Sequence, residues 1–191
     1  MIALGIVGEI GSGKTYVSKV FKHYGYNVFN ADKVVHNIYK KNKFINQKIS
    51  KIFKLSSNKV KLKYLANLII KNPSKLIKLN KIIHPGVKKK LLEFIKKNKK
   101  EKLIVLDIPL LLETNFKYFA DIVVFVDTAD KTLSKFRKKR RINIKLINVL
   151  KKYHLNKGKK KTLSDFVIKN TNLSFLKSQT RAILNRIILH D

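Results

Sequence analysis

The feature that most constrains the fold is a glycine-rich segment directly after a short apolar run. The run covers residues 2–7, and residues 8–15 read GEIGSGKT, a full match to the phosphate-binding pattern G-x-x-x-x-G-K-[ST]. The next apolar residues repeat every three to four positions, as in an amphipathic helix that ends before Gly25: Val17, Val20, Phe21 and Tyr24. A strand, a glycine-rich loop and a helix in this order predict a nucleotide-binding α/β domain.

Further apolar runs predict the remaining strands of a sheet. They cover residues 26–30, 103–106, 121–127 and 166–168. Because these runs are apolar on both faces, the sheet should be covered by helices on both sides. Helical patterns lie between the runs, and another, with Leu176, Ile183, Leu184 and Ile187, follows the last one. We therefore predict an α/β fold with a doubly wound parallel sheet of about five strands.

Two stretches read as helices without strands. Residues 40–100 carry two apolar stripes, one with Leu76, Leu79 and Ile83 and the other with Val87, Leu91 and Ile95. Proline disfavours a helix interior, so we expect Pro85 to break the chain between them. Residues 131–161 predict two short helices that end in a lysine-rich loop at 157–161. The first stretch is predicted to be a helical insertion in the α/β core.

The composition is strongly basic, with a formal net charge of +33, which invites a nucleic-acid partner. However, only five of the 44 basic residues are Arg, the residue that reads base edges and phosphates in bidentate fashion. The excess charge is concentrated in residues 40–100 and 131–161. We expect no specific nucleic-acid binding, and a bias in composition would produce this lysine content without selection for a function.

The chain contains no Cys, which excludes disulfides, thiolate metal sites and a Cys nucleophile. No apolar run approaches the ~20 residues that a membrane span needs. We therefore expect a cytoplasmic protein with no membrane partner.

The glycine-rich loop offers the clearest chemistry. Gly8, Gly11 and Gly13 allow backbone N–H groups to point at phosphates, and the following helix start adds positive potential. Lys14 can neutralise phosphate oxygens, and the Thr15 hydroxyl can bind Mg²⁺. The alternative is a glycine-rich turn with a purely structural role.

Two carboxylates follow predicted strands. Asp32 comes after the second strand, which we expect beside the strand of the glycine-rich loop, and it could orient an acceptor hydroxyl, take its proton, hold a metal, or cap a helix near Lys33. Asp107 ends the third strand and could hold Mg²⁺ through water or act as a cap. Position alone leaves these alternatives open.

Three other polar residues are weaker candidates. His84 precedes Pro85, where we expect a helix to end, and a lone His is usually packed or capping. Arg140 and Arg141 lie in a basic segment that could close over ATP, or they could belong to a solvated face.

Taken together, these segments resemble one family, the dephospho-coenzyme A kinases of the P-loop kinase superfamily. The resemblance rests on GEIGSGKT at 8–15, NADKVVH at 30–36, IHP at 83–85, DIPLLLE at 107–113, Arg140, and DFVIKN at 165–170. These segments occur in the family's order, and the match spans nearly the whole chain.

The resemblance implies transfer of a phosphoryl group from ATP, with Mg²⁺, to the ribose 3′-hydroxyl of dephospho-coenzyme A. It implies that Asp32 orients or deprotonates this hydroxyl and that Arg140 reaches the phosphates. It assigns further nucleotide contacts to Gly8, Gly11, Ser12, Gly13, Lys14, Thr15, Tyr16 and Asn170, and substrate contacts to Asp32, His84 and Asp107.

The resemblance also implies a domain organisation. Residues 37–100 would be a helical coenzyme-A-binding domain, residues 137–161 a lid, and residues 1–36, 101–136 and 162–191 the nucleotide-binding core.

The chain departs from the family pattern at several positions. Asn30 replaces a usual aspartate, and Glu9 replaces a usual glycine. A second lid arginine is missing around Asn148, and Leu155 or a neighbour occupies the place of a usual glutamine. Two other functions remain open: another small-molecule kinase of this fold, and a basic nucleic-acid-binding protein with a P-loop.

Overall fold

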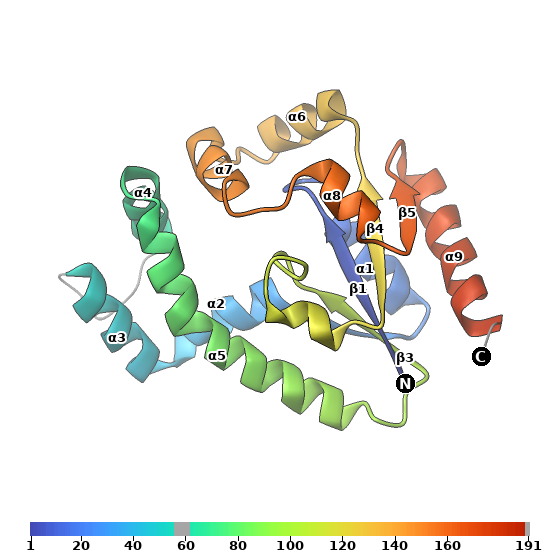
Figure 1. Ribbon diagram of the computed structural model, residues 1–191, viewed down its shortest axis with the longest axis horizontal. Helices are drawn as coiled ribbons and strands as arrows, with labels where there is room; N and C mark the ends of the chain where they lie inside the picture. Colours follow the sequence, from blue (N-terminus) through green and yellow to red (C-terminus); the bar gives the residue numbers. More distant parts are fainter. Residues whose placement is uncertain (56–61, 190–191) are drawn as a thin grey trace. The chain divides into compact units, whose positions relative to one another are not determined.

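The apolar runs of the sequence form one parallel sheet in the computed structural model, which describes residues 1–55 and 62–189 (Figure 1). Its strands are β1 (Ile2–Gly8), β2 (Asn27–Asn30), β3 (Leu103–Asp107), β4 (Ile122–Asp127) and β5 (Phe166–Lys169), in the order β2-β3-β1-β4-β5. The predicted α/β fold is confirmed. The parts of the predicted ranges 37–100 and 162–191 that fall on 56–61 and 190–191 lie outside the described residues.

One face of the sheet is covered by two helices. Helix α1 (Lys14–His23) and helix α9 (Leu173–Leu189) contact each other, and α9 lies along β5 (Figure 1). Alternate strand residues such as Leu4, Val105 and Val124 are buried against them. Because successive side chains of a strand point to opposite faces, every second apolar side chain of each strand lies under these helices.

The opposite face is covered by the segment after β3 and by a short helix. Gly5 lies on this face, where an added Cβ would collide with the Leu111 side chain. The 3₁₀ helix η1 (Asn115–Phe119) belongs to this segment, and α8 (Lys157–Thr162) contacts β1 and β4. Both faces are thus buried, as a parallel sheet requires.

The described chain divides into two units. The sheet unit comprises Met1–Asn30, Asn98–Ile142 and His154–Asp191. The helical unit comprises Ala31–Lys97 and Asn143–Tyr153. Its helices are α2 (Ala31–Lys41), α3 (Lys43–Phe53), α4 (Leu62–Lys71), α5 (Ser74–Lys97) and α7 (Ile144–Lys151). The range predicted as a lid, 137–161, is divided between the two units.

Helix α5 continues through Pro85, so the predicted break there is wrong. A proline inside a helix costs about 3 kcal/mol, because it lacks an N–H group and crowds the preceding turn. Apolar residues on both sides of it are buried, among them Leu79 and Val87, and α5 contacts α2, α3 and α4. Burial of this long apolar face outweighs the cost. At Gly86 an added Cβ would lie 3.0 Å from the Ile38 side chain, which shows how closely α2 approaches.

The basic stretch 131–161 forms three helices, α6 (Asp130–Lys139), α7 and α8, where we predicted two. Helix α8 occupies the segment that we expected to be a loop. The side chain of Asn156 caps it by accepting a hydrogen bond from the Lys159 N–H group at 2.8 Å. A run of lysines has no apolar period, so the helix could be recognised only from its cap.

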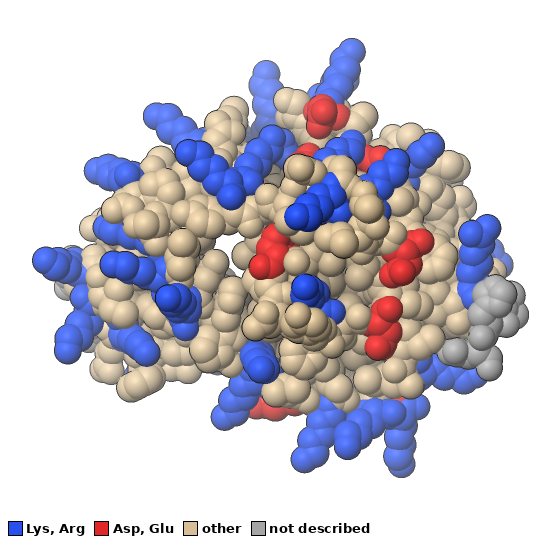
Figure 2. All heavy atoms as spheres, in the orientation of Figure 1, with Lys and Arg blue, Asp and Glu red and all other residues tan. Residues whose placement is uncertain are grey.

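Most basic side chains are solvated. Figure 2 shows Lys and Arg side chains standing out from the visible face, whereas Asp and Glu are sparse. Within residues 1–55 and 62–189, no helix combines the length and the apolar character that crossing a membrane demands.

Candidate phosphate-binding site

The glycine-rich loop joins β1 to α1 and ends in the left-handed backbone that only glycine adopts easily. Gly13, the N-cap of α1, has φ +98°, and a Cβ there would lie 2.7 Å from the amide nitrogen of Asn170. The loop therefore leads directly into the first turn of a helix, whose free N–H groups and dipole attract anions. This is the geometry of a phosphate site.

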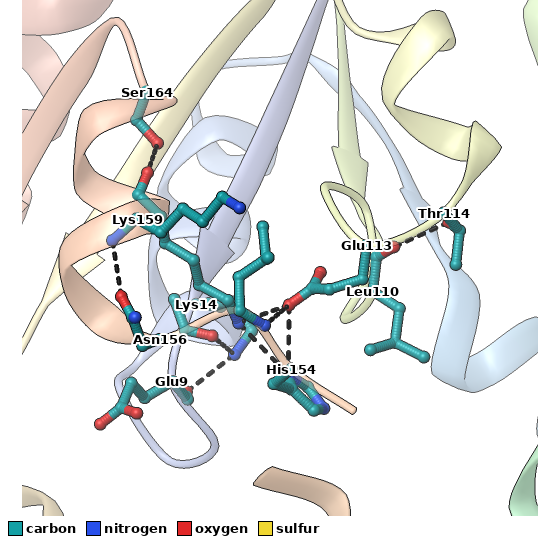
Figure 3. A network of polar contacts seen from close by, with 12 residues as sticks. Glu9, Lys14, Leu110, Glu113, Thr114, His154, Asn156, Lys159 and Ser164 are labelled. Carbon is teal, nitrogen blue, oxygen red and sulfur yellow. Dashed lines mark hydrogen bonds and ion pairs between the residues drawn. The ribbon is translucent and has the colours of Figure 1, made fainter. Parts of the chain in front are cut away.

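Lys14 lies back over the loop from the first turn of α1. Its ammonium donates hydrogen bonds to the carbonyl oxygens of Gly8 at 3.0 Å and Glu9 at 2.9 Å (Figure 3). The next residue, Thr15, is exposed, so its hydroxyl is accessible. Tyr16 is partly buried and packs against the apolar core.

Two side chains from distant strands hold the loop through one carbonyl oxygen. The Ser12 oxygen accepts from the Thr128 hydroxyl and from the Asn170 amide, each at 2.9 Å. Thr128 follows β4 and Asn170 follows β5, while the Ser12 side chain is itself buried. Asn170 therefore supports the loop backbone, and its predicted contact with the nucleotide stays a prediction.

An arginine that the sequence analysis did not select lies on the loop. Arg137 of α6 donates from Nε to the Ile10 carbonyl oxygen at 2.8 Å, and its Nη2 lies 3.8 Å from Oε2 of Glu9. The buried Leu133 lies one helical turn earlier, and this i, i+4 relation was the available signal. The selected Arg140 follows the last residue of α6 and is exposed.

Glu9 is a carboxylate in a loop built for anions, and basic side chains offset its charge. Arg137 is one, and Lys157 of α8 is another. A hydrogen bond to Asp127 raises the pKa of Lys157, and the negative charge of Glu9 contributes to this rise. The distance from Lys157 Nζ to Asp127 Oδ1 is 2.6 Å. These partners reduce the repulsion between Glu9 and an incoming phosphate.

The ends of β2 and β3 place an amide against a carboxylate. Asn30 is in register with Asp107, and its amide donates to Asp107 Oδ2 at 2.8 Å. Asp107 is 5% exposed, so a second carboxylate at position 30 would place a negative charge directly beside a buried one. Strand β3 separates β2 from β1, so our expectation that the second strand lies beside the strand of the loop is wrong.

A cluster of charged side chains lies near the loop and was also missed. Lys160 of α8 is buried, with its ammonium 2.9 Å from Oε1 of Glu113 and 3.2 Å from Nδ1 of His154. The same Glu113 oxygen accepts from the N–H group of Leu155 at 3.0 Å. A lysine in the middle of a lysine run gives no sign in the sequence that it alone is buried.

The surroundings keep His154 neutral. Burial lowers the pKa of His154 to about 4, the ammonium groups of Lys160 and Lys14 lower it as well, and the Glu113 carboxylate opposes them. The effect of Lys14 shows that this cluster and the phosphate loop belong to one electrostatic environment.

The depressed pKa of His154 predicts a loss of stability in mild acid. Below pH 6.5 the unfolded chain takes up a proton at His154, which the folded protein does not accept until about pH 4. The free energy of unfolding should therefore fall as the pH drops from 6.5 toward 4, by about 2–3 kcal/mol from this group. Urea unfolding between pH 7 and pH 4 measures it.

The control is His154→Gln, whose amide oxygen can still accept from Lys160 but does not titrate. We expect a smaller dependence of stability on pH in this variant, and equal dependence in the two proteins would contradict the assignment. Burial also lowers the pKa of His84, but His84 is present in both proteins.

Two predicted substrate residues lie in the helical unit. Helix α2 begins at Ala31, so Asp32 is an exposed residue of its first turn, which differs from the alternative of a cap to a helix beginning near Lys33. His84 is half-buried in the middle of α5, where we expected a helix end. The phosphate loop, Asp107 and Asn170 belong to the sheet unit.

The protein offers few oxygen ligands for a metal. In the described part of the chain, no three His, Cys, Asp or Glu side chains gather where they could hold an ion. Mg²⁺ bound to a nucleotide takes most of its ligands from phosphates and water and only one or two from the protein. The accessible hydroxyl of Thr15 and the carboxylate of Asp107 fit that requirement.

Several known proteins are similar to this chain in sequence and in fold. The family model described as dephospho-CoA kinase matches residues 2–174. A dephospho-CoA kinase from Wolbachia pipientis wMel is 32% identical over 193 residues, which cover 98% of each chain. The crystal structure of TT1252 from Thermus thermophilus has a TM-score of 0.81 at 23% identity and covers 97% of each chain. A dephospho-CoA kinase from Campylobacter jejuni has a TM-score of 0.65 at 22% identity and covers 97% of this chain and 96% of its own.

Proposed function

The chain belongs to the dephospho-CoA kinase family, and from this premise we propose that it transfers the γ-phosphoryl group of ATP to the ribose 3′-hydroxyl of dephospho-coenzyme A. The products are coenzyme A and ADP, and the reaction is the last step of coenzyme A synthesis. The observation that carries the proposal is the complete phosphate loop at the start of α1, in a chain that matches the family over residues 2–174.

The loop residues supply positive charge where the phosphates would bind. Backbone N–H groups at the start of α1 donate to phosphate oxygens. Lys14 exchanges its two loop carbonyl partners for the β- and γ-phosphates, which form stronger, charge-assisted bonds. Arg137 already contacts the loop backbone through Nε, and its Nη2 lies 3.8 Å from Glu9, so its positive charge is held beside the loop.

The remaining roles in this proposal are those that the family resemblance implies. Asp32 orients the acceptor hydroxyl and removes its proton, and Arg140 reaches the phosphates. The hydroxyl of Thr15, and Asp107 through water, would hold Mg²⁺, which supplies positive charge to the phosphates when bound.

The parts of the chain also receive their roles from the resemblance. The range 37–100 binds the coenzyme A moiety, and His84 lies within it. The range 137–161 forms a lid. A cytoplasmic location and the lack of a specific nucleic-acid partner stay predictions.

The test is ATP consumption by the purified protein with and without dephospho-coenzyme A, with the product identified by mass. We expect ADP to form only with this acceptor, and the product to gain one phosphoryl group. The control acceptors are AMP, a nucleoside monophosphate, and shikimate, a small-molecule alcohol. Equal or faster transfer to AMP or shikimate would assign the chain another acceptor. No turnover with any of the three acceptors would contradict the proposal that the protein is a kinase.

A further inference from the structure

Lys160 is buried near the phosphate loop, although the reaction proposed above gives it no role. It is 2% exposed, whereas its neighbours Lys159 and Lys161 in α8 are exposed. A lysine is rarely buried without a partner, because its ammonium loses hydration. The carboxylate of Glu113, itself 8% exposed at the side chain, supplies the partner at 2.9 Å.

Glu113 holds the segment 154–160 at two points. Its Oε1 accepts from the Leu155 N–H group near the start of the segment, at 3.0 Å, and from the Lys160 ammonium at its end. Glu113 lies in the segment after β3, next to Thr114, whose hydroxyl donates to the Leu110 carbonyl oxygen at 2.7 Å. The segment 154–160 is therefore fixed to a part of the chain that covers the sheet (Figure 3).

The hydrogen bonds also fix the state of His154. An ammonium group can only donate, so Nδ1 of His154, 3.2 Å from Lys160 Nζ, must accept and carries no proton. The proton of the neutral ring is then on Nε2. The charged groups that act on this ring are Lys160 from α8, Glu113 from the segment after β3, and Lys14 from α1.

We propose that Glu113 and Lys160 are positioning residues for phosphoryl transfer, which hold the segment 154–160 so that a neutral His154 stands near Lys14. This inference rests on the proposed function. A cationic ring there would repel the Lys14 ammonium as it turns to the phosphates, whereas a neutral ring does not. Errors of about 1 Å in such an arrangement lower catalytic rates by up to about 10²-fold.

The test compares Lys160→Met with the double variant Glu113→Gln, Lys160→Met. The single variant leaves a buried carboxylate without its partner, so its melting temperature should fall. The double variant removes both charges at nearly constant volume and should melt close to the wild type. Lys177→Met, the same change at an exposed lysine of α9, is the matched control and should leave both melting temperature and kcat unchanged.

In the double variant we expect kcat at least 10-fold lower and KM for ATP within about threefold of the wild type. Recovery of both stability and kcat would show that the ion pair only stabilises the fold, and would overturn the proposal. If a variant does not fold, a second measurement on the wild-type protein tests the same proposal.

This measurement is an NMR titration of the His154 ring with and without saturating Mg²⁺ and the non-hydrolysable analogue AMP-PNP. The pKa should rise from about 4 when the analogue binds, because the phosphates add negative charge near Lys14 and the ring. An unchanged pKa in a protein that binds the analogue would overturn the inference alone. If the protein does not bind the analogue, the proposed function itself is contradicted. The failure of this inference and the failure of the proposed function therefore give different results.

Discussion

Replacing Lys14 with alanine is expected to lower kcat/KM by about 10²-fold or more and to leave the fold intact. Phosphoryl transfer depends on positioning and on charge stabilisation in the transition state, so the loss of a phosphate-binding cation costs about 3 kcal/mol or more there. The Lys14 ammonium donates to the loop carbonyls of Gly8 and Glu9, and water can replace it at both. Steady-state kinetics and thermal unfolding measure the two effects.

Lys19→Ala is the matched control, because Lys19 is an exposed lysine of the same helix. It should keep the activity and melting temperature of the wild type. A folded Lys14→Ala protein with the activity of the wild type would exclude phosphate binding by this loop as the basis of catalysis.

Replacing Asp32 with asparagine is expected to lower kcat by about 10² to 10⁴-fold while the affinity for ATP stays within a few-fold. An amide can still accept a hydrogen bond but cannot remove a proton from the acceptor hydroxyl. The phosphate loop is unchanged in this variant, so nucleotide binding should persist. The measurement is kcat and KM for both substrates.

The outcome separates three roles of Asp32. If the Asp32 charge only stabilises the N-terminus of α2, the free energy of unfolding of the variant should fall by about 0.3–1 kcal/mol, and its activity should change little. If it holds a metal, ATP affinity should fall and recover with added Mg²⁺. Asp130→Asn, an exposed aspartate in the first turn of α6, is the control for the loss of a helix-terminal charge. An unchanged kcat would remove Asp32 from catalysis.

The sheet was predictable because its signal is local. Apolar runs on both sides of the phosphate-loop motif mark buried strands, and the motif itself requires a strand before it and a helix after it. The order of the strands was less accessible, since the placement of β3 between β2 and β1 depends on chain crossovers and not on any one segment. The pairing of Asn30 with Asp107 follows from that order.

The errors and omissions have a common cause in tertiary contacts. The cost of Pro85 in a helix is a local property, but the burial of α5 against three other helices outweighs it. Lys160 looks like an ordinary member of a basic run, and only the position of Glu113 distinguishes it. Burial of a long basic side chain depends on its partner, which lies far away in the sequence.

The anchoring of the Ser12 carbonyl has a consequence for the order in which the molecule acquires its activity. Both donors to this oxygen come from the second half of the chain, at Thr128 and Asn170. During synthesis, residues 8–15 leave the ribosome long before these donors exist, so the nascent loop lacks its supports. We therefore expect nucleotide affinity to develop only once β5 has joined the sheet, so that this affinity would report the completion of the domain.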